Sequence, residues 1–304
     1  MPSETAVEAK AIKITIIANA LMAGWGILFA VIARAEAILL DGIFSGISFC
    51  IGFLSLWVSS LVSRPGNDRY PFGYAVYEPL LNLCKGVMSF SVIVLALLSA
   101  GYALLTGGRE VSAGLAVIYA LVATAGCFLL AWRIRILADQ SGSSIVATDA
   151  KTWMVDGAIS AAVAVAFIAA FVLQQLGFHS LSNYVDPLAV VILALMMIKV
   201  PLGVVAGAWK QVVAQSADVE VIDEVEQVCQ LVMPEHGQLE WRARVLETGR
   251  QFYVHIGVLL ADGDSVSVAE QDQLREQVHA QLSAKTDHLQ LELFFTHDKR
   301  WLEF

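Results

Sequence analysis

Long apolar runs separated by short polar breaks dominate the first two thirds of the chain. An α-helix needs about 20 apolar residues to cross the hydrocarbon core of a bilayer. Six stretches reach that length, and each is predicted to be a transmembrane helix: residues 12–32, 37–61, 80–105, 113–132, 155–176 and 184–208. The first run lacks a small-residue cleavage site, so we interpret it as a span and not as a signal peptide.

After residue 215 the pattern becomes that of a soluble domain. Apolar residues at helical spacing predict a helix within 217–232, and alternating residues predict two strands within 240–265 joined by a turn at Glu247–Gly249. A second helix is predicted to begin at Ser267 with a capping box, and a third strand is predicted within 288–298. The expected organisation is therefore a membrane domain over residues 1–215 and a small α+β domain, in the order αββαβ, over 216–304.

The distribution of basic residues predicts the orientation of the spans. With six spans both termini lie on one side of the membrane. Only Arg34 and Arg109 fall on the opposite side, whereas most bases outside the spans flank the side of the termini: Lys10, Lys13, Arg64, Arg69, Arg133, Arg135 and Lys210. The positive-inside rule then places both termini in the cytoplasm of a multi-pass protein of the cell (plasma or inner) membrane.

Composition agrees with a chain that lives mostly in lipid. Hydrophobic residues make up 57% of the 304 residues and charged residues only 15%. Almost the whole net charge of −9 falls in the last ninety or so residues, which argues against nucleic acid as a partner. The four cysteines have no metal-finger spacing. No nucleophile with a neighbouring base, phosphate loop or cofactor fingerprint appears, so an enzyme and a prosthetic group are not expected.

Two carboxylates lie well inside predicted spans, where a charge is costly and usually functional. Asp41 is followed one helical turn later by Ser45, and Asp156 is preceded at helical spacing by Thr152 and Asp149. Carboxylates on two helices, flanked by hydroxyls, could surround a cation with oxygen donors. The alternative is that each acid only hydrogen-bonds a neighbouring helix.

Lys85 is a third charge within a span, seven residues or about two helical turns after Glu78. Its long side chain could reach the membrane interface. It could instead neutralise Asp41 or Asp156 when no cation is bound, which would make it a coupling element.

Four segments in order carry a family resemblance: "LLDGIFSGI", "RYPFGYAVYEPL", "ATDAKTWMVD" and "NYVDPLAVVILALMMI". With them, and with the αββαβ domain, the chain resembles the cation diffusion facilitators, which export divalent metals in exchange for protons. The resemblance covers nearly the whole length. It implies a homodimer, a C-terminal domain of the ferredoxin-like or metallochaperone-like kind, and a divalent cation as substrate.

The resemblance also implies a metal site between the second and fifth spans. Its four positions correspond to Asp41, Ser45, Thr152 and Asp156. Zinc exporters of the family commonly have Asp and His at the second and third positions, where this chain has serine and threonine. Carboxylates and hydroxyls form a harder donor set than imidazole, which favours Mn²⁺ or Fe²⁺, or a broad range that includes Zn²⁺, Co²⁺ and Cd²⁺.

Other metal positions of the family are less complete. Its histidines in the loop between the second and third spans are replaced by Tyr70 and Tyr74. In the C-terminal domain Asp272, His297 and Asp298 fall near its metal-binding positions and remain weaker candidates.

Three functions follow from these residues. The first is export of divalent metal by proton antiport. The second is a membrane protein that has kept the fold but acts as a metal-responsive regulator or as an accessory to another transport or redox system. The third is transport of a monovalent or organic cation.

Overall fold

A computed structural model describes residues 4–62, 64–141, 144–232, 240–283 and 288–303. The chain divides into two compact units, and each is described by itself. The first consists of Met1–Leu56 and Cys84–Val204, and the second of Trp57–Leu83 and Val205–Phe304. The second unit thus includes residues 57–83 and 205–215, which the predicted boundary at residue 215 assigns to the membrane domain. That boundary was inferred from the change in sequence pattern alone.

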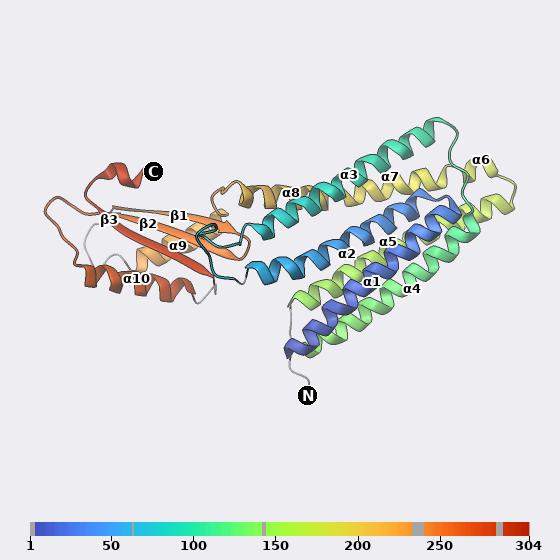
Figure 1. The fold of residues 1–304 in the computed structure, drawn as a ribbon. Coiled ribbons are helices and arrows are strands. Elements are labelled where there is room, and N and C mark those ends of the chain that lie inside the picture. Colours follow the sequence, from blue (N-terminus) through green and yellow to red (C-terminus); the bar gives the residue numbers. More distant parts are fainter. Residues whose placement is uncertain (1–3, 63, 142–143, 233–239, 284–287, 304) are drawn as a thin grey trace. The chain divides into compact units, whose positions relative to one another are not determined.

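Long helices form the apolar part of the chain (Figure 1). In the described residues there are six helical segments long and apolar enough to cross a membrane. Their helices are α1 (Glu4–Ala33), α2 (Glu36–Val62), α3 (Tyr77–Leu105), α4 (Ala113–Ser141), α5 (Ser144–Gln175) and, for the sixth segment, α6 (His179–Ser182), α7 (Val185–Met197) and α8 (Lys199–Val212). The predicted fold class of six spans followed by a small α+β domain is confirmed.

The fourth and fifth helices extend well beyond their apolar runs. The sequence pattern predicts a long break between residues 132 and 155, but α4 continues to Ser141 and α5 begins at Ser144. Helical hydrogen bonds are local, so a helix does not have to end where the apolar run ends. The intervening segment is rich in Arg, Ile, Leu and Ala and contains no proline, which favours continuation. Asp149 and Thr152 are consequently helical.

The sixth span is not one continuous helix. α7 ends at Met197 and α8 begins at Lys199, so the helix is interrupted at Ile198. Pro201 explains the break, because its ring lacks an N–H and clashes with the carbonyl four residues earlier, at Met197. The span predicted over 184–208 is nevertheless present, because Ile198 keeps helical dihedral angles and the stretch His179–Val212 is long and apolar enough to cross a membrane.

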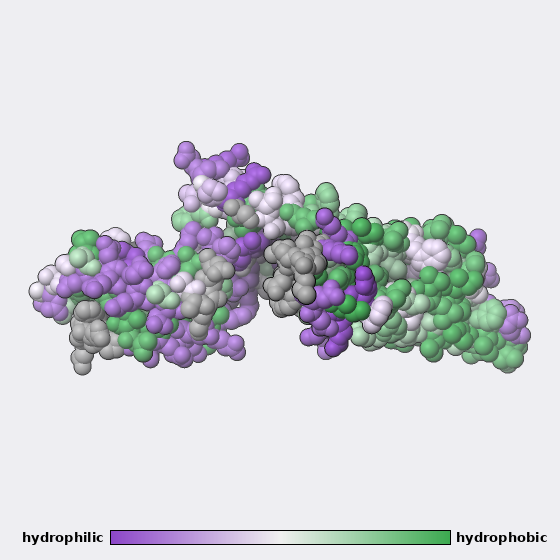
Figure 2. Space-filling view, turned by 90° about the horizontal axis from the view of Figure 1, so that it is seen from below, coloured by the Kyte–Doolittle hydropathy of each residue, from purple (hydrophilic) through white to green (hydrophobic). Residues whose placement is uncertain are grey.

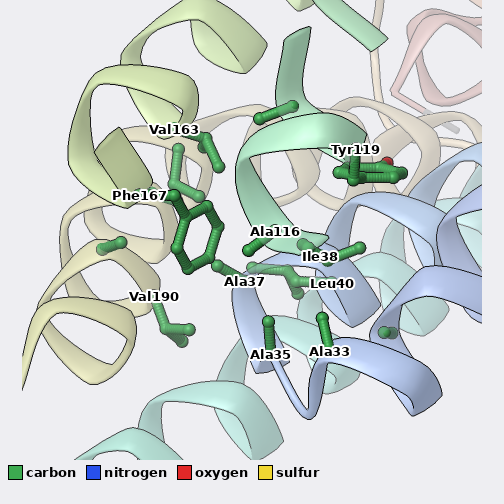
Figure 3. Close-up of a cluster of buried hydrophobic side chains, with 14 of the residues drawn as sticks. Ala33, Ala35, Ala37, Ile38, Leu40, Ala116, Tyr119, Val163, Phe167 and Val190 are labelled. Carbon is green, nitrogen blue, oxygen red and sulfur yellow. The ribbon is translucent and has the colours of Figure 1, made fainter. Parts of the chain in front are cut away.

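Small residues line the interior of the first unit. Among the described residues, its main cluster of buried side chains contains eleven alanines. Ala33, Ala35, Ala37 and Ala116 are among them, and Phe167 and Val190 belong to the same cluster (Figure 3). Without a hydrophobic driving force between helices in lipid, close backbone approach supplies the packing energy. α1, α4 and α5 lie side by side in this unit (Figure 1). Large apolar side chains such as Leu21 and Leu95 point outward and give the helices an apolar surface (Figure 2).

The second unit contains the small sheet. β1 (Glu240–Thr248) pairs antiparallel with β2 (Gln251–Leu259), and β2 pairs parallel with β3 (Leu289–Thr296), in the order β1-β2-β3. The parallel pair requires a crossover, which α10 (Val268–Ser283) provides. α9 (Val219–Val232) and α10 cover the sheet and share its buried core, and the 3₁₀ helix η2 (Lys299–Leu302) follows β3.

Of two local predictions for this domain, the capping box is confirmed and the turn between the first two strands lies later in the chain than predicted. Ser267 and Glu270 form the capping box of α10, with the Ser267 N–H donating to Glu270 Oε2 at 2.7 Å and the Glu270 N–H donating to Ser267 Oγ at 3.3 Å. The turn between β1 and β2 consists of Gly249 and Arg250 and begins two residues later than predicted, because Glu247 and Thr248 still pair with β2. Gly249 adopts a φ of +59°, which glycine tolerates best.

Candidate cation site

Asp41 lies where α1 and α2 nearly touch. A side chain on Gly26 would bring its Cβ within 2.7 Å of the Gly42 Cα, so only glycine fits on either helix. Paired small residues of this kind let two membrane helices pack backbone to backbone. The residue before Gly42 is thereby fixed in place, with Asp41 turned to the interior of the unit and half-buried.

Asp156 occupies a similar position between α4 and α5. A Cβ on the next residue, Gly157, would lie 3.1 Å from the Phe128 ring and 3.3 Å from the Cys127 Cβ. The two helices are therefore closely packed at this level. The Asp156 carboxylate lies within electrostatic range of Asp41, so the structure brings together the two acids that the sequence singles out.

The predicted hydroxyl positions lie on the same helices. Residues 41 and 45 are both within α2, and residues 149, 152 and 156 are all within α5, so the helical spacing assumed from the sequence is present. Ser45 is half-buried, whereas Thr152 is exposed in the single chain.

α4 contributes two residues that the sequence does not single out. The Tyr119 hydroxyl donates a hydrogen bond to Asp41 Oδ2. Cys127, only 2% exposed, lies within electrostatic range of both Asp41 and Asp156, and its thiol is hydrogen-bonded with Ser160. The only sequence signal for Tyr119 is a phenol within an apolar run, which needs a hydrogen-bond partner when buried.

The arrangement offers a cation two carboxylates and several weaker donors. Within the described ranges, no group of three or more His, Cys, Asp or Glu side chains lies close enough to hold a metal ion. A cation between Asp41 and Asp156 would therefore need hydroxyl oxygens or water to complete its coordination. Such a set is typical of hard cations and not of a tetrahedral zinc site.

A comparison with protein families agrees with this reading of the helices. The family model for the cation efflux transmembrane domain matches residues 12–209. The chain belongs to the cation efflux family. The resemblance to cation diffusion facilitators is confirmed, and the chain is a multi-pass membrane protein of a transporter family.

One characterised relative is similar over most of its length. The manganese efflux system protein MneP of Bacillus subtilis (strain 168) is 24% identical over 221 residues, which cover 72% of this chain and 73% of that protein.

The two charges near the start of α3 in this cation efflux protein have different partners. Lys85 lies within electrostatic range of Asp149, a partner not considered from the sequence. Glu78 pairs instead with Arg250: it accepts hydrogen bonds from the Arg250 backbone N–H at 2.9 Å and from its Nε at 2.8 Å. Glu78 and Lys85 therefore interact with different residues: Glu78 with Arg250, and Lys85 with Asp149.

Two of the three weaker candidates in the C-terminal domain, Asp272 and Asp298, form ion pairs with arginines. Asp272 forms an ion pair with Arg275. Asp298 accepts hydrogen bonds from the Arg300 side chain and, at 3.0 Å, from its backbone N–H, which caps η2. These hydrogen bonds from Arg300 lower the pKa of the Asp298 carboxyl. His297 is exposed.

A polar network at the beginning of α2 is a further feature that the sequence did not predict. Asp186, 1% exposed at the start of α7, accepts the Glu36 and Ala37 N–H groups at 3.2 and 3.1 Å, and so caps α2. Arg109 bridges Asp186, at 3.0 Å, and Glu36, and it also donates to Ser99 Oγ at 3.0 Å. The network joins residues from the beginning of α2, from α3 and its following loop, and from α7.

Proposed function

We propose that this chain exports divalent metal cations from the cytoplasm in exchange for protons. The observation that supports the proposal is the pair of carboxylates, Asp41 on α2 and Asp156 on α5, which lie within electrostatic range of each other in the membrane-spanning part of a cation efflux protein. Two acids within the spans of one helix bundle are costly without a function.

The donor chemistry favours a hard metal such as Mn²⁺ or Fe²⁺, or broad specificity, over strict selectivity for Zn²⁺. Asp41 and Asp156 supply carboxylate oxygens, and Ser45 and Thr152 would supply hydroxyls at the other two positions. Oxygen donors suit Mn²⁺, whereas imidazole and thiolate suit Zn²⁺. The similarity to a protein named for manganese efflux supports the same choice.

Proton exchange would use the same carboxylates. Histidine is the side chain best suited to titrate near neutral pH, and the proposed site contains none. Asp41 and Asp156 together carry two negative charges that either a divalent cation or protons can neutralise in a medium of low dielectric constant. Release of the metal and uptake of protons would then alternate as a helix bundle opens to one side and the other. We further propose that the protein is a homodimer in the cell membrane.

The proposal is tested in vesicles that contain the purified protein and a pH-sensitive dye. Addition of Mn²⁺, Fe²⁺, Co²⁺, Zn²⁺ or Cd²⁺ is expected to drive proton movement for Mn²⁺ or for several metals. Asp41→Asn and Asp156→Asn should abolish it, whereas Asp262→Asn, in an exposed turn, should not. No metal-driven proton flux with any of these ions would overturn the proposal, and flux with Zn²⁺ alone would overturn the inferred preference for hard metals.

A further inference from the structure

Tyr119, a buried tyrosine of α4, contacts the proposed cation site through Asp41. Tyr119 is 2% exposed and belongs to the main cluster of buried side chains. Figure 3 shows its ring, with the hydroxyl oxygen at the end of the ring. Its hydroxyl donates to Asp41 Oδ2. A phenol has a single O–H to donate, so this hydrogen bond commits it to one carboxylate oxygen.

The space for the Tyr119 hydroxyl is created by the backbone around it. A Cβ on Gly26 would lie 3.2 Å from the Tyr119 oxygen, which is closer than most side chains tolerate. The Phe29 ring is a neighbour of the Tyr119 ring, with the two centroids 6.0 Å apart, but it does not contact the hydrogen bond itself through any polar atom. The helix crossing that brings Gly26 to Gly42 therefore also makes room for the hydroxyl beside Asp41.

The hydrogen bond leaves one Asp41 oxygen for a cation. Oδ2 accepts from Tyr119, so Oδ1 is the atom that can face Asp156 and the interior of the site. A carboxylate that is held in this way binds metal in a defined orientation, and partners that orient a ligand are typically worth about 10- to 100-fold in metal affinity or activity. Ser45 and Thr152 are weak donors, so the orientation of the carboxylates matters more here than in a site with four strong ligands.

We propose that Tyr119 is a positioning residue of the cation site, which holds Asp41 so that its free oxygen binds the metal. This inference rests on the proposed function, because it takes Asp41 to be a ligand. It adds a third helix, α4, to a site otherwise formed by α2 and α5. The hydroxyl is expected to keep its hydrogen bond to Asp41 when the cation is bound.

The test measures Mn²⁺ affinity of the full-length protein in lipid nanodiscs from the loss of the free-ion electron paramagnetic resonance signal. Tyr119→Phe removes the hydroxyl and keeps the ring, and it should weaken Mn²⁺ binding about 10-fold or more. The KM of Mn²⁺-driven flux should rise in parallel, with a smaller change in the maximal rate.

Matched variants separate this role from packing. Phe29→Leu disturbs the neighbouring ring but leaves the hydroxyl, and Tyr102→Phe removes a hydroxyl from an exposed tyrosine of α3. Both should bind Mn²⁺ as the unaltered chain does. Equal weakening by Phe29→Leu and Tyr119→Phe would mean that only packing matters, and unchanged or tighter binding by Tyr119→Phe would show that the hydroxyl does not position Asp41. Either result overturns the inference.

The outcome for the proposed function is separate. If the unaltered chain does not bind Mn²⁺, or if Asp41→Asn binds it normally, the proposed site is wrong and the inference falls with it. If Asp41→Asn abolishes binding but Tyr119→Phe does not affect it, only the inference falls. Should Tyr119→Phe fail to fold, infrared difference spectra of the unaltered protein with and without Mn²⁺ answer the same question. Tyrosine bands that stay unchanged while carboxylate bands shift support the inference, and a phenol released on binding overturns it.

Discussion

The proposed cation site has four side-chain positions, and at two of them, Ser45 and Thr152, this chain differs from the pattern expected of zinc exporters. Replacing Ser45 by Asp and Thr152 by His should shift transport preference toward Zn²⁺, because the double variant gains a carboxylate and an imidazole. The ratio of Zn²⁺- to Mn²⁺-driven proton flux in vesicles measures the change. Ser45→Ala with Thr152→Ala is the control, and it should not gain Zn²⁺ transport. A double variant with unchanged selectivity would mean that the cation is held elsewhere.

Single residues also show how far sequence can predict the site. Asp41 and Asp156 can be predicted as site residues because a charge in an apolar run is costly and usually functional. Helical spacing then identifies the hydroxyl residues on the same helix faces. Tyr119 and Cys127 are not visible, because tyrosine and cysteine are ordinary in apolar runs and only the crossing of helices brings them to the acids. The surroundings of Lys85 depend in the same way on how α3 packs, and in the structure Lys85 lies within electrostatic range of Asp149.

At the scale of elements, the beginning of α2 depends on a side chain from α7. Asp186 accepts two N–H groups of α2 and an Arg109 hydrogen bond while almost fully buried. Asp186→Ala should lower the free energy of unfolding by about 3 kcal/mol, because it leaves two helix N–H groups without their acceptor and removes one of the two carboxylates that pair with Arg109. Asp186→Asn, which keeps one acceptor oxygen, should lose less.

Thermal unfolding of the purified protein, followed by tryptophan fluorescence, measures this loss of stability. Asp262→Ala removes an exposed carboxylate from a turn and should leave the midpoint unchanged. If Asp186→Ala unfolds at the same temperature as the unaltered chain, the network at this end of α2 does not stabilise the fold.

Elements differ in how well the sequence predicts them. The sheet domain follows its pattern closely, since Val254, Ile256 and Val258 alternate toward one face and are all buried. The capping box fixes the start of α10 from two residues alone. The ends of α4 and α5 do not follow hydropathy, because hydropathy reports where lipid ends and not where helical hydrogen bonding ends. The break before Pro201 is predictable in principle, but the apolar run conceals it.

At the scale of the whole chain, the two charge signs are unevenly distributed along the sequence. Acids and bases nearly cancel up to about residue 215, and the acidic excess lies in the C-terminal domain. Because cytoplasmic connections of membrane proteins are enriched in Lys and Arg, the positions of Lys10, Arg64 and Arg133 argue for a cytoplasmic N-terminus. With an even number of spans, we then expect the C-terminal domain on the same side, from which the proposed export takes its metal.

This orientation is tested by labelling single cysteines with a membrane-impermeant maleimide. In a chain whose own four cysteines are replaced by alanine, Ser180→Cys on α6 should react in intact cells, because it lies in the connection between the fifth and sixth spans. Asp262→Cys, in the C-terminal domain, should react only after the membrane is permeabilised. Both positions are exposed, so a difference in labelling reports the side of the membrane and not burial. The reverse labelling pattern would mean that both termini lie outside the cytoplasm. The proposed exchange would then move metal in the opposite direction.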